Sequence, residues 1–354
     1  MSEMNSRERV LAAINRRPVD RIPTDIWVTG EVWGRLAAHF GPGADVLEAL
    51  GIDGFAGIGP VYVGPTLAPS CGGERDMWGI RAEAVAYEGG AYEEQTVWPL
   101  AGARTIDDLE AYRWPTADLF DYSRMRAEAE LKRRTHVVKC GYMAPFFMHN
   151  QLRGLEASLM DPLEAPEFTR HLLERLCGFL YEQHRRMFEA CEGLVDVAEV
   201  TDDLGSQTGP LISPGVYREF YAPHHRRFIG LCREFGIKVF HHDDGGIRPF
   251  LPDLVEMGID ILNPVQWTCP GMDMAELKRE FGGRLCFHGA VENQRVLPFG
   301  TQEEVRAEVR HCIDSLAPDG TGYILAPCHN LQANTPLGNI LAMYDEARSY
   351  GKAR

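Results

Sequence analysis

KVFHHDDGGIRPFLPDLVEMGIDILNPVQ, residues 238–266, contains two apolar runs that each end in polar side chains. Lys238–His242 predicts a strand, Pro249–Met257 a short helix and Ile261–Gln266 the next strand. Two strands that are joined through a helix form a parallel pair with a right-handed crossover. This stretch is therefore one βα unit, and it places the chain in the α/β class.

The same alternation extends on both sides of this unit. Further strands are predicted at Pro23–Val28, Val137–Tyr142, Val195–Thr201, Leu285–Val291 and Tyr323–Pro327. Helices are predicted from Pro166 to about Ala190, from Ser213-Pro214 to Gly236, after the cap Asp273, after the capping box of Thr301 and Glu304, and over Leu337–Tyr350. These units predict an open parallel sheet or a closed barrel. We prefer a (β/α)₈ TIM barrel, because polar residues recur at the strand ends where a barrel has its active site.

Residues 55–135 interrupt the alternation. They are rich in Gly, Pro, Tyr and Trp, and Ala84–Tyr92 against Glu94–Trp98 predicts a small β element. We interpret them as an irregular inserted cap region over the barrel mouth. The whole chain, residues 1–354, is then one domain.

The composition excludes several classes of function. The 354 residues include 36 basic and 51 acidic side chains, a formal net charge of −15. This charge disfavours nucleic acid as a partner, because phosphate binding requires a basic face. No apolar run approaches the ~18 residues of a membrane span, and the N-terminus MSEMNSRERV lacks the apolar stretch of a signal peptide. With nine cysteines and no CxxC pair, the sequence predicts a reduced, cytoplasmic enzyme.

Metal-binding residue types follow several of the predicted strands. His242 and Asp244 lie two residues apart and point to the same face if the strand continues, so both can reach one ion. Cys328 follows the last strand and would complete a three-ligand site with an open fourth position, as in catalytic zinc sites. Imidazole, carboxylate and thiolate together predict Zn²⁺. For each residue alone, a capping or packing role is the alternative.

Other strand ends supply candidates for catalysis and substrate binding. Glu199, Asp203 and His288 are candidate catalytic residues, because each is titratable and lies at or beside a strand end. Asn263 and Gln266 are candidates for orienting a substrate or a ligand. The candidates for an apolar substrate pocket, with core packing as the alternative, are Tyr142, Phe146 and Met148. His224 and His225, beside two arginines, are predicted on a solvated helix face.

Several long motifs resemble the uroporphyrinogen decarboxylase superfamily over nearly the whole chain. They are SRERVLAAINRRPVDRIP (6–23), DMWGI (76–80), AEVTDDLGSQTGPLISPGVYREFYAPH (198–224), HHDDGGIRPFLPDLVEMGIDILNPVQ (241–266), FHGAVENQRVLPFGT (287–301) and GYILAPCHNLQANTPLGNILAMYDEA (322–347). Within the superfamily the chain resembles the corrinoid-dependent methyltransferases. The resemblance implies a (β/α)₈ barrel.

The methyltransferase branch has a zinc site of the form His-x-Cys with a second Cys far downstream. Here Asp244 stands where that pattern has its first Cys, and Cys328 matches the downstream Cys. The departure leaves open whether His329 takes over ligation, and Glu199 or Asp203 is a further oxygen ligand to consider. The resemblance implies zinc-dependent methyl transfer between a small thiol or methoxylated compound and a corrinoid. Because the chain lacks a D-x-H-x-x-G motif, the corrinoid is expected on a separate partner protein.

Two alternatives stay open. One is a metal-free decarboxylase, of a porphyrinogen or another acid, with a strand-end Asp as proton donor. The arginine-rich stretch of the haem-pathway decarboxylase has no match in WVTGEVWGR (27–35), and an octa-acid substrate would require an arginine cluster at the mouth. The other is a non-catalytic subunit that binds a corrinoid protein. The sequence leaves a homodimer open.

Overall fold

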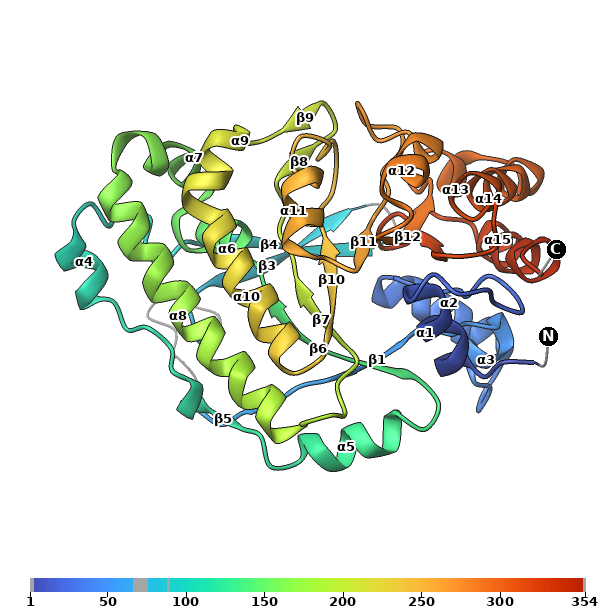
Figure 1. The fold of residues 1–354 in the computed structure, drawn as a ribbon, viewed down its shortest axis with the longest axis horizontal. Coiled ribbons are helices and arrows are strands. Elements are labelled where there is room, and N and C mark those ends of the chain that lie inside the picture. Colours follow the sequence, from blue (N-terminus) through green and yellow to red (C-terminus); the bar gives the residue numbers. More distant parts are fainter. Residues whose placement is uncertain (1–2, 66–75, 88–89, 353–354) are drawn as a thin grey trace.

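Seven parallel strands form the central sheet of the computed structural model, which describes residues 3–65, 76–87 and 90–352 (Figure 1). Their order in the sheet follows their order in the chain, as consecutive βα units require. The strands are β1 Phe55–Ile58, β6 Val137–Met143, β7 Val197–Val200, β10 Lys238–His242, β11 Ile261–Asn263, β12 Cys286–Val291 and β13 Tyr323–Pro327. The last six confirm the six strands predicted in the second part of the chain.

The extended segment around Thr24 joins the two edges of this sheet. On one side, the Leu325 N–H of β13 donates to the Pro23 carbonyl and the Asp25 N–H donates to the Leu325 carbonyl, both at 2.9 Å. On the other side, the N–H of Asp53, just before β1, donates to the Thr24 carbonyl at 3.0 Å. The sheet therefore closes on itself, and the predicted (β/α)₈ barrel is confirmed.

The predicted strand Pro23–Val28 is reduced to two isolated parallel bridges. Thr24 pairs with Leu325, and Val28 pairs with Leu331. Pro23 has no N–H, and the Thr24 N–H donates to the Asp53 carboxylate at 3.0 Å. These positions offer few backbone donors to a neighbouring strand, so no continuous ladder forms.

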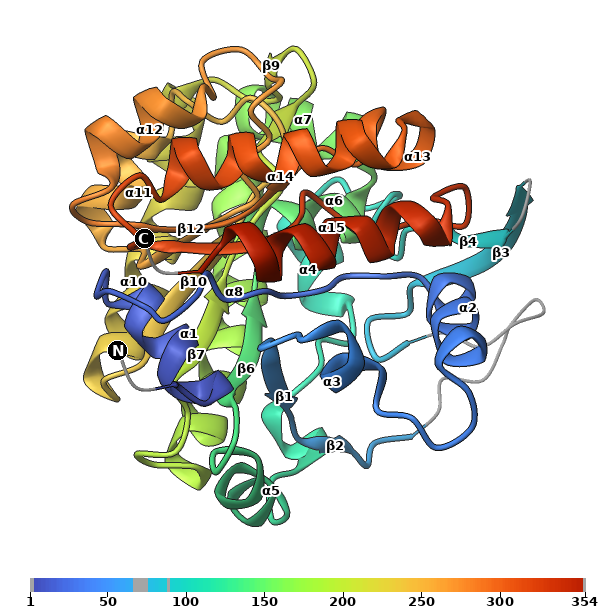
Figure 2. The same ribbon diagram turned by 90° about the vertical axis from the view of Figure 1, so that its right-hand side faces the viewer.

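Helices cover the outside of the barrel (Figures 1 and 2). α8 begins at Pro166 and ends at Ala190, as predicted, and buries Leu172 and Leu176 completely. The capping box at Thr301 is also present. The other helices are α1 Ser6–Ile14, α2 Gly30–Phe40, α3 Val46–Leu50, α6 Pro145–Arg153, α7 Leu155–Glu164, α9 Pro214–Val216, α10 Ala222–Glu234, α11 Leu251–Met257, α12 Met274–Phe281, α13 Val296–Phe299, α14 Gln302–Leu316 and α15 Leu337–Tyr350.

The helix predicted from Ser213-Pro214 to Gly236 consists of α9, a π-helical turn at Tyr217–Tyr221 and α10. On α10 the predicted solvated position of His225 is wrong. Its side chain is fully buried, with Nδ1 2.9 Å from the Tyr217 hydroxyl and Nε2 3.0 Å from the Asp202 carboxylate. The two partners satisfy both ring nitrogens, which makes burial of this histidine acceptable.

Residues 55–135 are only partly an excursion. β1 belongs to the barrel, because Phe55 pairs in parallel with Val137 of β6. The predicted β element is present with shifted bounds, and Val85 pairs with Tyr92. The elements outside the barrel sheet are β2 Val61–Tyr62, β3 Arg81–Tyr87, β4 Gly90–Val97, α4 Ile106–Ala111, the 3₁₀ turn η1 Ala117–Leu119, β5 Phe120–Asp121 and α5 Met125–Lys132. Figure 2 shows the β3–β4 hairpin and α5 at different ends of the molecule, so this segment is not confined to one end of the barrel.

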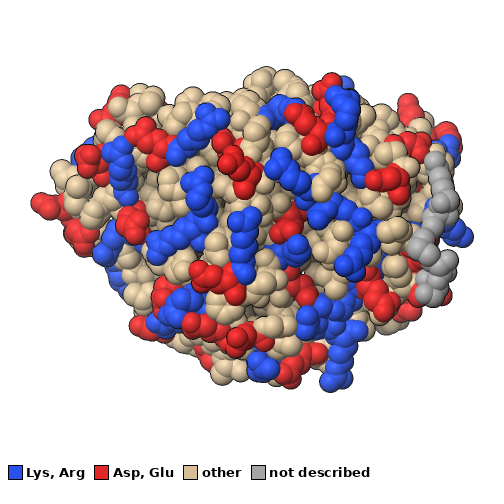
Figure 3. All heavy atoms as spheres, in the orientation of Figure 1, with Lys and Arg blue, Asp and Glu red and all other residues tan. Residues whose placement is uncertain are grey.

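On the face formed by α8 and α10, basic and acidic side chains lie beside one another (Figure 3). Arg186 Nε is 2.8 Å from Glu182 and Arg170 Nη2 is 2.5 Å from Glu219. None of the helices in the described residues is both long and apolar enough to cross a membrane. The eight cysteines in this part of the chain are free and buried, and Cys71 lies outside it.

Candidate functional site

Loops that follow β7, β10, β11, β12 and β13 surround a cavity of about 530 Å³ at the carboxyl ends of the strands. This is where barrel enzymes place their active sites. Of the described residues that line it, none is Lys or Arg, and each has a polar side-chain atom. They are Tyr92, Asp203, Gln207, Asp244, Gln266, Asn293, Gln294, Cys328, His329, Asn330, Gln332 and Asn334.

Three side chains of types that can bind a metal lie close together at this cavity. His242 is the last residue of β10, Asp244 follows two residues later, and His329 follows β13. One donor atom from each lies within 4.8 Å of the other two. Asp244 Oδ2 is 3.8 Å from His242 Nε2 and 3.7 Å from His329 Nε2. Donors of a tetrahedral zinc ion with 2.0–2.1 Å bonds are about 3.3 Å apart, so the three side chains would have to move closer together to hold such an ion, by about half an ångström for the two pairs that involve Asp244.

The fit of these residues to a metal also depends on the free nitrogen of His242. Its Nδ1 is 2.6 Å from the side-chain oxygen of Asn263, and its Nε2 faces the carboxylates of Asp203 and Asp244. The backbone N–H of His242 donates to the Thr201 hydroxyl at 3.0 Å. These contacts fix the orientation of the imidazole, and its Nε2 is directed at the cavity.

Cys328 lies on the wall of the same cavity, but its thiol is directed elsewhere. It donates to the Val265 carbonyl with an Sγ–O distance of 3.4 Å. Burial, with a smaller contribution from Asp244, raises the pKa of this thiol well above its ordinary value. Among the described residues, the donors that converge are those of His242, Asp244 and His329. The three side chains that lie together are therefore those of His242, Asp244 and His329. This is the predicted alternative in which His329 takes the place of Cys328.

Two glycines allow the loop with Asp244 to approach the short β8–β9 hairpin, Gly205–Ser206 and Gly209–Pro210. A Cβ on Gly205 would lie 2.2 Å from the Asp244 carbonyl oxygen, and a Cβ on Gly245 would lie 2.5 Å from the Ser206 carbonyl oxygen. Gln266, a candidate for orienting a substrate or a ligand, supports this loop from the cavity wall, because its side-chain oxygen accepts the Gly245 N–H at 2.8 Å. Close backbone packing therefore fixes the position of Asp244.

Asp203 is the candidate catalytic residue that the structure places at the cavity. Its Oδ1 lies 3.8 Å from His242 Nε2. Partial burial raises the pKa of Asp203 to about 7; His242 opposes the rise, and the carboxylates of Asp243 and Asp244 add to it. A carboxyl group with this pKa is able to take up or release a proton near neutral pH.

Glu199 and His288 lie below the cavity, inside the barrel. Glu199 is 2.6 Å from Lys139 Nζ, whose ammonium lies 4.8 Å from the ring centroid of Phe240. His288 is completely buried between Asp25 and Asn263. Asn263 is also completely buried, so its partners are protein groups.

The candidates for an apolar substrate pocket have a different position. Phe146 is completely buried and packs edge-on against Tyr221 at 5.2 Å between centroids. Met148 is 8% exposed, and neither residue lines the cavity at the mouth. Of the three, Tyr142 is the exposed one. Phe146 and Met148 pack in the core, because α6 turns them toward it; core packing was the predicted alternative to a substrate pocket.

Sequence reasoning missed Trp27, which lies beside the two histidines of the site, and Asp25, which contacts the buried His288. The Trp27 ring centroid is 5.4 Å from that of His242 and 6.2 Å from that of His329. Both residues lie in the predicted strand Pro23–Val28, so their position in a barrel strand was the available signal.

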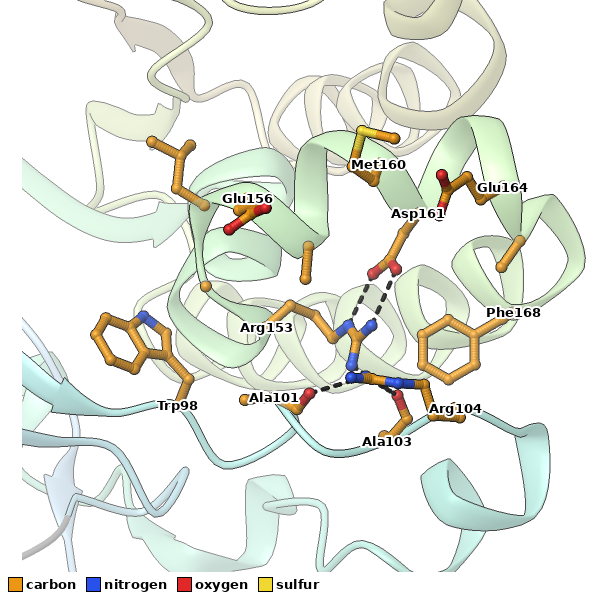
Figure 4. Close-up of a pocket in the computed structure, with 14 residues that line it drawn as sticks. Trp98, Ala101, Ala103, Arg104, Arg153, Glu156, Met160, Asp161, Glu164 and Phe168 are labelled. Atoms are coloured by element: carbon orange, nitrogen blue, oxygen red, sulfur yellow. Dashed lines mark hydrogen bonds and ion pairs between the residues drawn. The ribbon is translucent and has the colours of Figure 1, made fainter.

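A cavity of about 770 Å³ lies away from these residues, between α7, the start of α8 and residues 98–104 (Figure 4). Arg153 is directed into it, but its Nε and Nη2 donate to the Asp161 carboxylate at 2.7 and 2.9 Å. Its Nη1 donates to the carbonyls of Leu100 and Ala103. These partners use the guanidinium donors, so Arg153 ties α6 to the neighbouring loop.

Comparisons with known proteins indicate a family. Residues 104–350 match the family model described as uroporphyrinogen decarboxylase (URO-D). A methylated-thiol–coenzyme M methyltransferase of Methanosarcina mazei is 30% identical over 203 residues, which are 56% of this chain and 49% of that protein. A uroporphyrinogen decarboxylase of Dechloromonas aromatica is 24% identical over 181 residues, 48% and 49% of the two chains. The chain thus spans about half the length of the curated relatives it matches.

The fold is shared with a solved structure described as a methyltransferase from Methanosarcina mazei. The TM-score is 0.69 and the sequence identity is 20%, over 98% of this chain and 99% of the other. At this identity the similarity shows the fold, and the seven-stranded closed sheet described above agrees with it.

Proposed function

Because the chain belongs to the uroporphyrinogen decarboxylase family, we propose that it is a zinc-dependent methyltransferase. It would move a methyl group between a small thiol or methoxylated compound and a corrinoid on a separate protein. The observation that carries this proposal is the convergence of His242, Asp244 and His329 at a polar cavity on the barrel mouth. The similarity to a methyltransferase that acts on methylated thiols supports the choice of reaction.

The residues that would hold the metal are His242, Asp244 and His329. Two imidazoles and one carboxylate leave a fourth position for a substrate atom, which is the arrangement of catalytic zinc sites. When bound there, zinc supplies Lewis-acid chemistry to the sulfur or oxygen that carries the methyl group. The carboxylate in place of a thiolate leaves more positive charge at the centre.

The chain's own residues would position the substrate and move its proton. The amide side chains on the cavity wall, such as Gln207 and Asn330, offer donors and acceptors to a small polar molecule. Trp27 provides a flat apolar surface beside His242 and His329. Asp203 Oδ1 lies 3.8 Å from His242 Nε2 and would be the group that exchanges a proton with the demethylated heteroatom.

The family also contains decarboxylases, and the Dechloromonas relative is one of them. A porphyrinogen with many carboxylates requires several cationic side chains, and the described lining of the mouth cavity contains no Lys or Arg. We therefore favour methyl transfer over decarboxylation. A subunit that binds a corrinoid protein without catalysis is the remaining alternative.

Metal analysis followed by a methyl-transfer assay tests the proposal. The purified chain is loaded with Zn²⁺, and methyl transfer to free cob(I)alamin is measured with methylated thiols and methoxylated aromatics. We expect about one zinc per chain and methylation of cob(I)alamin, both lost in His242→Ala. The matched control is His171→Ala, since His171 is an α8 residue whose Nε2 is 2.5 Å from Glu110 near the surface, and it should keep both.

Two results would contradict the proposal. Porphyrinogen decarboxylation by metal-free protein would favour the decarboxylase. Stoichiometric zinc without transfer from any donor, together with tight binding of a corrinoid protein, would favour the non-catalytic subunit.

A further inference from the structure

A row of hydrogen-bonded side chains connects His242 to the interior of the barrel. Asn263 is 2.6 Å from His242 Nδ1 through its oxygen and 2.7 Å from His288 Nδ1 through its nitrogen. His288 Nε2 is in turn 3.0 Å from Asp25 Oδ2. Asn263 and His288 are completely buried, and Asp25 is 7% exposed. The two central side chains, Asn263 and His288, are therefore closed off from solvent and have protein groups as their partners.

The direction of every hydrogen bond in this row follows from the carboxylate at its inner end. An ionised Asp25 accepts only, so His288 must donate its Nε2–H. The other nitrogen of a neutral His288 is then an acceptor and requires the amide NH₂ of Asn263. The Asn263 oxygen consequently faces His242 and accepts a proton from Nδ1. His242 is left with a lone pair on Nε2, which is the nitrogen that faces Asp203 and Asp244.

We propose that Asp25, His288 and Asn263 are positioning residues that hold His242 in the tautomer with its proton on Nδ1, ready to bind a metal through Nε2. This inference deepens the proposed function and rests on the metal centre assumed there. The opposite tautomer would present an N–H to the cavity and would have to lose that proton before binding. Hydrogen bonds of this kind to the second nitrogen of a histidine ligand fix its orientation and increase its basicity.

The surroundings of the row keep it intact. Three rings pack around His288, with centroid distances of 5.3 Å to Phe240 and 6.0 Å to both Phe55 and Trp27. Burial opposes ionisation of Asp25, but the hydrogen bond from His288 Nε2, together with the positive charge of Lys139, holds the pKa of that carboxyl below its ordinary value. Asp25 thus stays ionised and accepts the hydrogen bond of His288, which sets the direction of the other hydrogen bonds in the row.

The most direct test is the tautomer of His242 in the full chain without added metal. Side-chain ¹⁵N–¹H spectra of histidine-labelled protein distinguish a protonated from an unprotonated ring nitrogen, and His242→Gln assigns the signal by its loss. We expect the proton on Nδ1 and an unprotonated Nε2. A proton on Nε2 of His242 overturns the inference, and the His242→Gln protein is used only to assign the signal.

Zinc affinity, measured by competition with a chelator, tests the consequence. Asn263→Ala should weaken Zn²⁺ binding by about 10–100-fold, the usual effect of removing such a partner. Asn263→Asp keeps an acceptor for His242 Nδ1 and should bind zinc within about threefold of the wild type. Leu262→Val is the matched control, because Leu262 is equally buried on β11 and points to the opposite face.

The outcomes separate this inference from the proposed function. If the wild type binds no zinc but His242 has the expected tautomer, the metal centre fails and the hydrogen-bond row stands. If the wild type binds zinc and Asn263→Ala binds it equally well, the role of the row is refuted and the metal centre stands.

Discussion

Substitution of Gly205 by Ala should weaken zinc binding although Gly205 is not a ligand. A Cβ at this position would lie 2.2 Å from the Asp244 carbonyl oxygen and 2.8 Å from a methyl carbon of Ile247. Ordinary van der Waals contacts begin at 3.4 Å, so the loop with Gly205 and the loop with Asp244 would have to move apart by about 1.2 Å. The backbone of Asp244 is one of the two groups that must move.

The size of the effect follows from this displacement. Metal–ligand distances tolerate deviations of about 0.2 Å, so a shift of about 1 Å removes most of the contribution of Asp244. Structural zinc sites bind with about 10–16 kcal/mol, and one ligand of four therefore contributes about 3 kcal/mol. Zn²⁺ affinity should fall roughly a hundredfold, and the free energy of unfolding by about 1–3 kcal/mol through overpacking.

Chelator competition for Zn²⁺ and urea unfolding of the zinc-free protein measure the two effects separately. Gly178→Ala is the control, because Gly178 lies within α8 and a Cβ there meets nothing within 4 Å. It should leave zinc binding unchanged and stabilise the protein by about 0.5–1 kcal/mol. Zinc affinity in Gly205→Ala that equals that of the wild type would refute the reasoning.

Two further predictions concern the residues that bind zinc and the free energy of unfolding at acidic pH. His329→Ala should lower Zn²⁺ affinity roughly a hundredfold and Cys328→Ala less than about fivefold, as measured by chelator competition; the reverse order would assign ligation to the cysteine. For Asp161 (Figure 4), burial opposes ionisation, but the hydrogen bonds from His149 and Arg153 lower the pKa from 3.8 to about 2. The ionised carboxylate thus stabilises the fold by about 2 kcal/mol above pH 3.8, and this contribution is lost as the pH falls through 2. Asp161→Asn should therefore have a lower free energy of urea unfolding than the wild type at pH 7, and the difference between the two proteins should become smaller toward pH 2. A difference that stays constant from pH 7 to pH 2 would contradict this account.

The barrel could be predicted from local sequence because its signals are local. The bounds of α8 follow from a proline at its start and one apolar face, and the capping box at Thr301 fixes the start of α14. β1 was missed because FAGI is short, contains a glycine and lies in a Gly- and Pro-rich segment. Its strand state depends on pairing with β6, which is a tertiary interaction.

The candidate site was predictable in part for the same reason. His242 and Asp244 are two residues apart, so their common direction follows from strand geometry. The choice between Cys328 and His329 is different, because neighbouring residues point to different sides and the sequence does not say which side faces the ion. The contact of His288 with Asp25 joins distant parts of the chain through barrel closure, and no local pattern encodes it.

The central claim, a metal centre built from His242, Asp244 and His329, is tested most directly by X-ray absorption of the zinc-loaded protein. Zinc has nitrogen and oxygen ligands at about 2.0–2.2 Å and sulfur ligands at about 2.3 Å. The account predicts a first shell of nitrogen and oxygen alone, with the scattering pattern of two imidazoles, and one imidazole fewer in His329→Ala. A sulfur shell that disappears in Cys328→Ala, or failure to retain stoichiometric zinc, would contradict it.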